Sequence, residues 1–335
     1  MKYLFALVVA GLLLWLVFKQ VDFNELVLRL KDVKYGYVIA AILLAVISYW
    51  VRGYRWKLML SPLGYPVETY RVFLAVNIGY LANLFFPRMG EISRCGVLKR
   101  TDNVNLTVSI GSVVAERLVD LLSLMFLTLL SLVLEYQLLG GYLRRIFDAK
   151  IEGISGNLPA IYLIAGVLAT LVISVYFIIR VYKEKLKRIP LFLKIRQLLT
   201  HLAEGITSIQ KVEKKGQFWA LTILMWFLYF LMTYLVVFSI PETSSLTLKA
   251  GLTILVTGSF GMATPVQGGI GAFHALVSGV LVLYGISLAD GILYATILHT
   301  SQIFAVIIFG GTSLLITMFL KKRNLENPED EEKPD

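Results

Sequence analysis

Cysteine and histidine are scarce in this 335-residue chain, which has one cysteine, Cys95, and three histidines. A single thiol excludes an intramolecular disulfide and a cysteine-rich metal site. The histidines, at positions 201, 274 and 299, are too scattered for the close spacing of paired metal ligands. We therefore expect no metal ion, no cofactor and no catalytic motif.

Charged residues are also few, at 16% of the chain, against about 25% in soluble domains. Hydrophobic residues make up 57%, and the mean hydropathy is +0.75. These values predict an all-α polytopic integral membrane protein. The net charge of +10 does not indicate a nucleic-acid partner, because basic residues are normal on the cytoplasmic loops of membrane proteins.

The apolar runs predict a single transmembrane domain over residues 1–323, followed by a disordered acidic tail at 324–335. Its first half covers about 36–134 and its second about 218–320. Six full spans are expected, near 3–18, 35–51, 103–134, 160–179, 218–240 and 288–320. The first resembles a signal peptide, but no small-residue cleavage site follows it, so we interpret it as a retained span.

The aromatic and basic residues that end the second span, from Tyr49 to Lys57, are typical of a headgroup boundary. A basic connector at about 180–216 has an apolar face at helical spacing. It is either an amphipathic helix on the cytoplasmic membrane surface or a solvated linker.

Two further apolar runs, at 72–86 and 250–263, are shorter than the roughly 20 residues that a membrane span requires. Each run ends in the same pattern, Pro87-x-x-Gly90 and Pro265-x-x-Gly268. A broken helix that carries charge is costly in lipid unless it lines a protein-walled cavity. We therefore expect two re-entrant, broken-helix hairpins, with Pro87 and Gly90 at one tip. The other tip holds Pro265, Gly268, Gly269 and Gly271.

The basic segments at 180–216 and 321–323 are expected in the cytoplasm, which places both termini there. The first hairpin then enters the cytoplasmic (inner) membrane from inside and the second from outside. Halves of opposite orientation are typical of a transporter with an inverted repeat.

The first break carries Arg88, Glu91 and Arg94 at intervals of three, so a helix that starts near Gly90 would gather them into one cluster. Arginines at such a break can hold a lipid phosphate, since guanidinium binds phosphate in a bidentate manner. Alternatively, Glu91 neutralises Arg88 or Arg94 at the membrane surface.

Glu116, Arg117 and Asp120 lie within about one turn of the long helix expected at 103–134. They either contact substrate or form a structural salt bridge to Arg88 or Arg94.

His274 and His299 are either proton relays or hydrogen-bonded packing residues. The glycines at 268, 269 and 271 either offer backbone N–H groups to an anion or permit close helix packing.

Three motifs together resemble the flippase-like transmembrane family typified by the membrane domain of lysylphosphatidylglycerol synthase. They are Asn83-x-x-x-Pro87-Arg88-x-Gly90-Glu91 with Arg94, then Glu116-Arg117-x-x-Asp120, and Pro265-x-x-Gly268-Gly269-x-Gly271. The resemblance implies lipid translocation, with Asn83, Gln267 and His274 joining the charged residues at the headgroup. It does not imply the synthase reaction, which belongs to a separate soluble domain. Gln267 and His274 stand where the family commonly has proline and glutamate.

We expect a flippase for a polar-headed anionic lipid, either a phospholipid or a polyprenyl-phosphate-linked precursor, and not an enzyme. One alternative is a membrane-embedded transferase or phosphatase that modifies lipid. Another is an accessory subunit that partners an envelope-biosynthesis enzyme. The sequence leaves the oligomeric state open.

Overall fold

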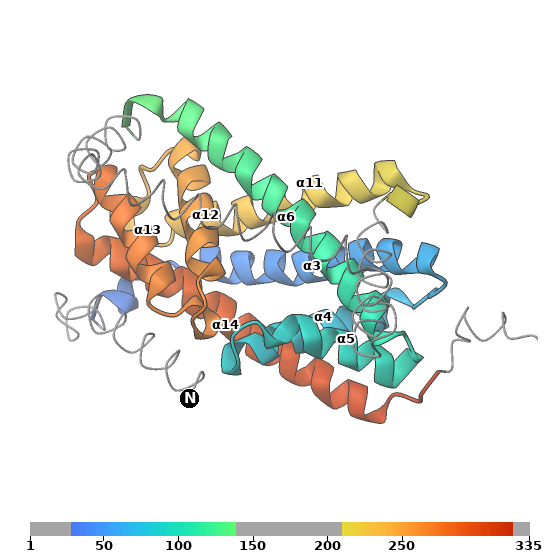
Figure 1. Ribbon diagram of the computed structural model, residues 1–335. Helices are drawn as coiled ribbons and strands as arrows, with labels where there is room; N and C mark the ends of the chain where they lie inside the picture. The colour runs from blue at the N-terminus through green and yellow to red at the C-terminus, as the bar shows by residue number, and fades with distance from the viewer. Residues whose placement is uncertain (1–27, 139–209, 324–335) are drawn as a thin grey trace, which may run out of the picture.

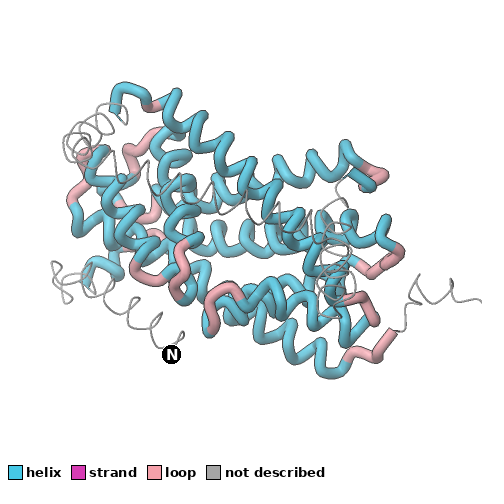
Figure 2. Tube along the Cα trace, viewed as in Figure 1, coloured by secondary structure: helices cyan, strands magenta, loops and turns pink. Residues whose placement is uncertain are grey.

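The computed structural model describes residues 28–138 and 210–323, and within these ranges it contains helices and turns but no strand (Figure 2). The spans expected at 3–18 and 160–179 lie outside the described residues. So do most of the basic connector and the acidic tail.

Four long helices form the body of the described structure (Figure 1). They are α3 (Tyr35–Leu60), α6 (Leu106–Leu134), α11 (Lys215–Val237) and α14 (Leu288–Phe319), each long and apolar enough to cross a membrane. Side-chain caps define two of their starts, because Asn105 accepts from the backbone N–H groups of α6 and Ser287 from that of Asp290. These four helices match four of the six expected spans.

The described residues also form two pairs of shorter helices. α4 (Thr69–Phe85) and α5 (Met89–Asp102) form the first pair. α12 (Leu248–Ala263) and α13 (Ala272–Leu283) form the second and are separated by the 3₁₀ turn η4 (Gln267–Gly269). Three further 3₁₀ turns lie at Leu30–Asp32, Ser61–Leu63 and Pro241–Thr243.

The break between α4 and α5 folds the chain back on itself, so that Gly79 and Gly90 meet. A methyl group at Gly90 would collide with the carbonyl oxygen of Gly79 and the side chain of Asn83. The N–H of Gly90 donates to Asn83 Oδ1 at 2.7 Å, which satisfies one of the free backbone donors at the start of α5. Glycine is therefore required at this close approach.

The break between α12 and α13 depends on a left-handed backbone. Gly268, Gly269 and Gly271 have φ values of 56°, 72° and 83°, which favour glycine over any residue with a side chain. Beyond the turn, Gly261 of α12 packs on the backbone of Phe273 in α13.

The two short pairs lie at opposite ends of the described bundle, and their breaks approach each other near its middle (Figure 1). α4 contacts η4, and a Cβ built on Gly268 would lie 3.2 Å from Leu84 Cδ2. α14 packs along both α4 and α13 and so joins the two pairs. The breaks expected from the Pro-x-x-Gly patterns are thus neighbours in space.

Candidate functional site

A buried cluster of ionised side chains joins α3, α5 and α6. At its centre is the Glu116 side chain, which has no exposed surface. Its two oxygens lie 2.7 Å from Arg52 Nη2 and 2.8 Å from Arg94 Nη2, and Arg55 Nη2 is 3.2 Å away. Glu116 therefore neutralises part of the charge of three arginines that water does not reach.

Asp120, one turn further along α6, continues the cluster. Its oxygens lie 2.8 Å from Arg52 Nη2 and 2.6 Å from Arg55 Nη2. Arg117, between the two acids, lies 2.8 Å from Glu91 Oε1. The charged side chains of α3, α5 and α6 thus form one network of ion pairs.

Arg52 and Arg55 are functional candidates that the sequence interpretation missed. Their position among aromatic residues predicted a headgroup boundary, whereas the structure buries both side chains inside the bundle. α3 continues to Leu60, past the span end expected at 51, and it buries both arginines together with Trp56. The available signal was their spacing, because residues three apart on a helix share a face.

Trp56 stabilises the Arg94 guanidinium beside this cluster. The Arg94 guanidinium stacks 4.4 Å from the centre of the indole ring, while the indole N–H donates to Ser112 Oγ at 2.9 Å. The aromatic face thus gives Arg94 a cation–π partner in a water-poor region.

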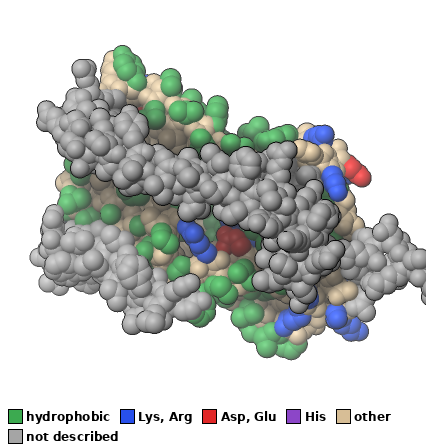
Figure 3. Space-filling view, viewed as in Figure 1, with side chains coloured by type: hydrophobic (Ala, Val, Ile, Leu, Met, Phe, Trp, Pro, Cys, Tyr) green, Lys and Arg blue, Asp and Glu red, His purple; other side chains and the backbone are tan. Residues whose placement is uncertain are grey.

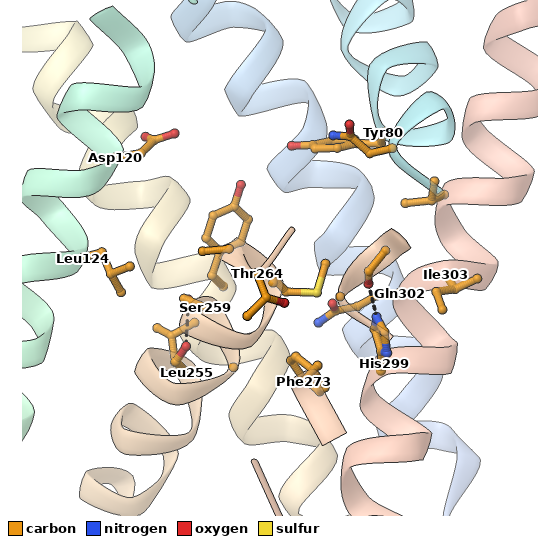
Figure 4. Close-up of a pocket in the computed structure, with 18 of the residues that line it drawn as sticks. Tyr80, Asp120, Leu124, Leu255, Ser259, Thr264, Phe273, His299, Gln302 and Ile303 are labelled. Atoms are coloured by element: carbon orange, nitrogen blue, oxygen red, sulfur yellow. Dashed lines mark hydrogen bonds between the residues drawn. The ribbon is translucent and has the colours of Figure 1, made fainter. Parts of the chain in front are cut away.

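A cavity of about 530 Å³ lies between this cluster and the second break. Its wall uses the central parts of the long helices, including Asp120 of α6, Tyr229 of α11 and Gln302 of α14. In Figure 4, Asp120 and Tyr80 lie on one side of the cavity, with Phe273 and Leu255 on the opposite side. Figure 3 shows basic and acidic side chains next to each other, with hydrophobic side chains close by. The cavity is therefore amphipathic and lies near the middle of the spanning helices.

The expected headgroup residues divide into two groups. The cavity wall includes Asn83, Arg88, Glu91, Arg117 and Asp120. The other four, Arg94, Glu116, Gln267 and His274, do not line it. Arg94 and Glu116 adjoin it through the ion cluster, and His274 is buried behind it.

The expected cluster of Arg88, Glu91 and Arg94 on one helix face is not what the structure shows. Arg88 precedes α5, while Glu91 pairs with Arg117 and Arg94 pairs with Glu116. The alternative in which Glu91 neutralises Arg88 or Arg94 is therefore also wrong. The expected Glu116–Arg94 salt bridge is confirmed.

Arg88 itself is exposed at the cavity wall and makes no ion pair with the residues that the structure describes. Its φ of 62° is in the left-handed region, which is uncommon for a residue other than glycine. Such backbone strain persists where the surrounding structure imposes it, and it often occurs at functional sites. Arg88 is therefore the strongest ligand-binding candidate in the cavity.

Two histidines lie behind the second break. His299 of α14 bonds through Nε2 to the carbonyl oxygen of Gly268 at 2.8 Å, and the ring of Phe273 stacks on it at 4.8 Å (Figure 4). The ring of His274 lies 5.1 Å from that of His299. His299 thus holds the tip of the second hairpin against α14, as the packing alternative predicts.

Within residues 28–138 and 210–323, no group of three or more histidine, cysteine or acidic side chains could hold a metal ion. The cavity offers guanidinium groups, carboxylates and hydroxyl groups instead. Such a set is suited to binding a charged headgroup by ion pairs and hydrogen bonds.

Comparison with known families gives a match over residues 3–310 to the model described as the lysylphosphatidylglycerol synthase TM region. The chain belongs to the lysylphosphatidylglycerol synthase transmembrane-region family. The resemblance inferred from the three motifs is thereby confirmed. Together with the four long apolar helices, the match identifies a multi-pass membrane protein of this family.

Two curated proteins are similar to this family member. It is 27% identical over 165 residues to UPF0104 membrane protein MJ1595 of Methanocaldococcus jannaschii, a match that covers 48% of each chain. It is 33% identical over 123 residues to Glycosyltransferase AglD of Haloferax volcanii, which covers 35% of this chain and 20% of that protein. The matches thus cover half or less of the curated relatives. No solved structure matches the chain.

Proposed function

We propose that this protein is a lipid flippase that moves a polar-headed anionic lipid, or a lipid-linked precursor, between the leaflets of the cytoplasmic membrane. The observation that carries the proposal is the amphipathic cavity at the junction of the two helix breaks. Its charged wall suits a headgroup and its apolar wall suits the start of the acyl or isoprenyl chain. In this proposal the cavity lies near mid-membrane, where transporters with broken helices bind their substrates.

The proposed mechanism uses the two short helix pairs as re-entrant hairpins related by an inverted repeat. In this proposal both termini are cytoplasmic, and residues 1–323 form one transmembrane domain. The contact between Leu84 and Gly268 then lies between the two faces of the membrane. If the hairpin tips separate on one side of this contact, the cavity opens to the leaflet on that side. The opposite placement of the pairs in the bundle supports this arrangement (Figure 1).

In this mechanism Arg88 binds the headgroup phosphate, because it is the exposed arginine at the tip. Arg117, whose side chain is 42% exposed, can add a second contact from α6 by exchanging its bond to Glu91. The bonds that Arg52, Arg55 and Arg94 make to Glu116 keep the charged wall in place while the substrate passes. Asp120 pairs with Arg52 and Arg55, and Glu91 pairs with Arg117, so each acid offsets part of the positive charge of this wall.

A test of transport compares Arg88→Gly with Asn103→Gly. Both residues have a left-handed backbone, one at each end of α5, so glycine fits both positions. We expect Arg88→Gly to abolish translocation of a fluorescent phospholipid in a leaflet-reporter assay in liposomes. Asn103→Gly should retain wild-type rates. Equal, wild-type rates in both variants, each shown to be inserted, would refute the proposal.

The similarity to a protein named as a glycosyltransferase favours one second candidate, a membrane-embedded transferase that modifies lipid. Mass spectrometry of lipids incubated with the pure protein and sugar donors distinguishes the two functions. Flipping leaves every lipid mass unchanged, whereas the transferase yields a covalent product.

A further inference from the structure

The charges that the described residues place around the cavity do not cancel. Five guanidinium groups, those of Arg52, Arg55, Arg88, Arg94 and Arg117, either line the cavity or pair with an acid that adjoins it. Among residues 28–138 and 210–323, three carboxylates oppose them, those of Glu91, Glu116 and Asp120. Five positive and three negative charges leave a net charge of +2.

No other described group around the site supplies the missing negative charge. The remaining titratable side chains are three tyrosines and one histidine at the cavity wall, together with the buried Cys95 on α5. The tyrosines are Tyr49, Tyr80 and Tyr229, and the histidine is His299. Phenol, thiol and imidazole groups carry no negative charge at neutral pH in an apolar region.

An excess of two positive charges is costly near the middle of a membrane, because the low dielectric constant there strengthens the repulsion between the arginines. Arginine cannot relieve this cost by losing its proton. An anionic ligand relieves it, and the two cations with exposed side chains at the cavity wall, Arg88 and Arg117, are available to contact that ligand.

We propose that the lipid carried in this cavity has a headgroup of about two negative charges, namely a phosphomonoester or a diphosphate. This inference rests on the proposed function and assigns its substrate class. A phosphomonoester has a charge of about −1.5 to −2 at pH 7 and three oxygens, which allow bidentate pairing with two guanidinium groups. A phosphodiester leaves the site at +1, and a zwitterionic headgroup leaves it at +2.

The same count argues against a cationic headgroup. Lysylphosphatidylglycerol, the lipid that gives the family its name, carries two amino groups and one phosphodiester, and it would raise the charge of the filled site to +3. The inferred substrate class therefore differs from that lipid in the sign of its charge.

The test measures binding of four dioleoyl lipids to the purified full chain by native mass spectrometry. The lipids are phosphatidic acid, phosphatidylglycerol, phosphatidylcholine and lysylphosphatidylglycerol, which differ only in their headgroups. At pH 8 we expect phosphatidic acid to bind about tenfold tighter than phosphatidylglycerol, which corresponds to about 1.4 kcal/mol. At pH 5 this advantage should shrink, because the second proton of a phosphomonoester binds with a pKa of about 6.

Arg88→Gln should remove most of the preference for phosphatidic acid over phosphatidylglycerol. Arg29→Gln is the matched control, because Arg29 pairs with Glu242 and Asp290, away from the cavity, and should keep the preference. Equal binding of phosphatidic acid and phosphatidylglycerol, or tighter binding of lysylphosphatidylglycerol, would overturn the assignment. Displacement of phosphatidic acid by millimolar inorganic phosphate would show that soluble phosphate, rather than a lipid, is the ligand.

The leaflet assay with the same lipids separates the two proposals. If phosphatidic acid binds preferentially but no lipid moves, the headgroup assignment stands and the flippase function falls. If all four lipids bind and move equally, transport stands and the headgroup assignment falls.

Discussion

Glu116 is the residue on which the charged wall of the cavity depends. It accepts ion pairs from arginines on two other helices, Arg52 and Arg55 on α3 and Arg94 on α5. Removing one partner from a buried cluster leaves charges uncompensated, whereas removing one partner from an exposed pair costs little. Position in the fold, rather than residue type, therefore sets the importance of each acid.

Glu116→Gln should lower the free energy of unfolding by about 3–5 kcal/mol, because three buried arginines lose their shared carboxylate. Glu68→Gln is the control, since Glu68 pairs with Arg323 where both side chains are exposed, and its loss should cost less than about 1 kcal/mol. Thermal unfolding in detergent measures both variants. A similar melting temperature for the two would contradict a structural role for Glu116.

At the scale of elements, close backbone contact holds the tip of the first hairpin. α4 and α5 meet where Gly79 faces Gly90, and the amide of Asn83 bridges the break. Small residues permit such approach between helices in a membrane. The tip that presents Arg88 is consequently sensitive to a single added methyl group.

Gly90→Ala should destabilise the protein by about 1–3 kcal/mol, as overpacking does, since α5 must move away from α4. It should also weaken binding of the headgroup, because Arg88 moves with the break. Gly96→Ala, on the same helix with no neighbouring atom within 4 Å, should be neutral or stabilising by up to about 1 kcal/mol. Melting temperature and lipid binding of the pair are the measurements. Equal melting temperatures would show that the close contact is unimportant.

At the scale of the whole molecule, α14 unites the two helix pairs. It packs against α13 in the second half and along α4 in the first. Gly310 makes the contact with α4, where an added Cβ would lie 2.7 Å from Leu81 Cβ and 3.0 Å from the Asn77 carbonyl oxygen. The cavity between the pairs depends on this approach.

Gly310→Ala should lower the melting temperature and widen the gap between α14 and α4, at a cost of about 1–3 kcal/mol. Adjacent Gly311 has no atom within 4 Å of its added Cβ, so Gly311→Ala should keep or slightly raise stability. Hydrogen exchange of α4 amides, read with the melting temperatures, locates the effect. If exchange in α4 were the same in both variants, the α4–α14 contact would not hold the halves together.

The sequence by itself determined the membrane class and the positions of most described elements. Long apolar runs predict spans whatever their neighbours are, because lipid rejects unpaired backbone and charge along the whole segment. The same reasoning located both breaks, since Pro87 and Pro265 each follow a run too short to span. The motifs at these two breaks, together with the motif that contains Glu116 and Asp120, identified the family.

Only the tertiary structure decided which charges meet. The sequence predicted that Arg52 and Arg55 are headgroup anchors. Hydropathy does not distinguish a helix end that lies at the membrane surface from a helix end that is buried, as this one is by α6 and α11. Arg88 and Arg94 are six residues apart, yet the left-handed turn at Arg88 sends one to the cavity and the other to Glu116. Ion pairs form between residues far apart in sequence, so their partners follow from helix packing, which no local pattern contains.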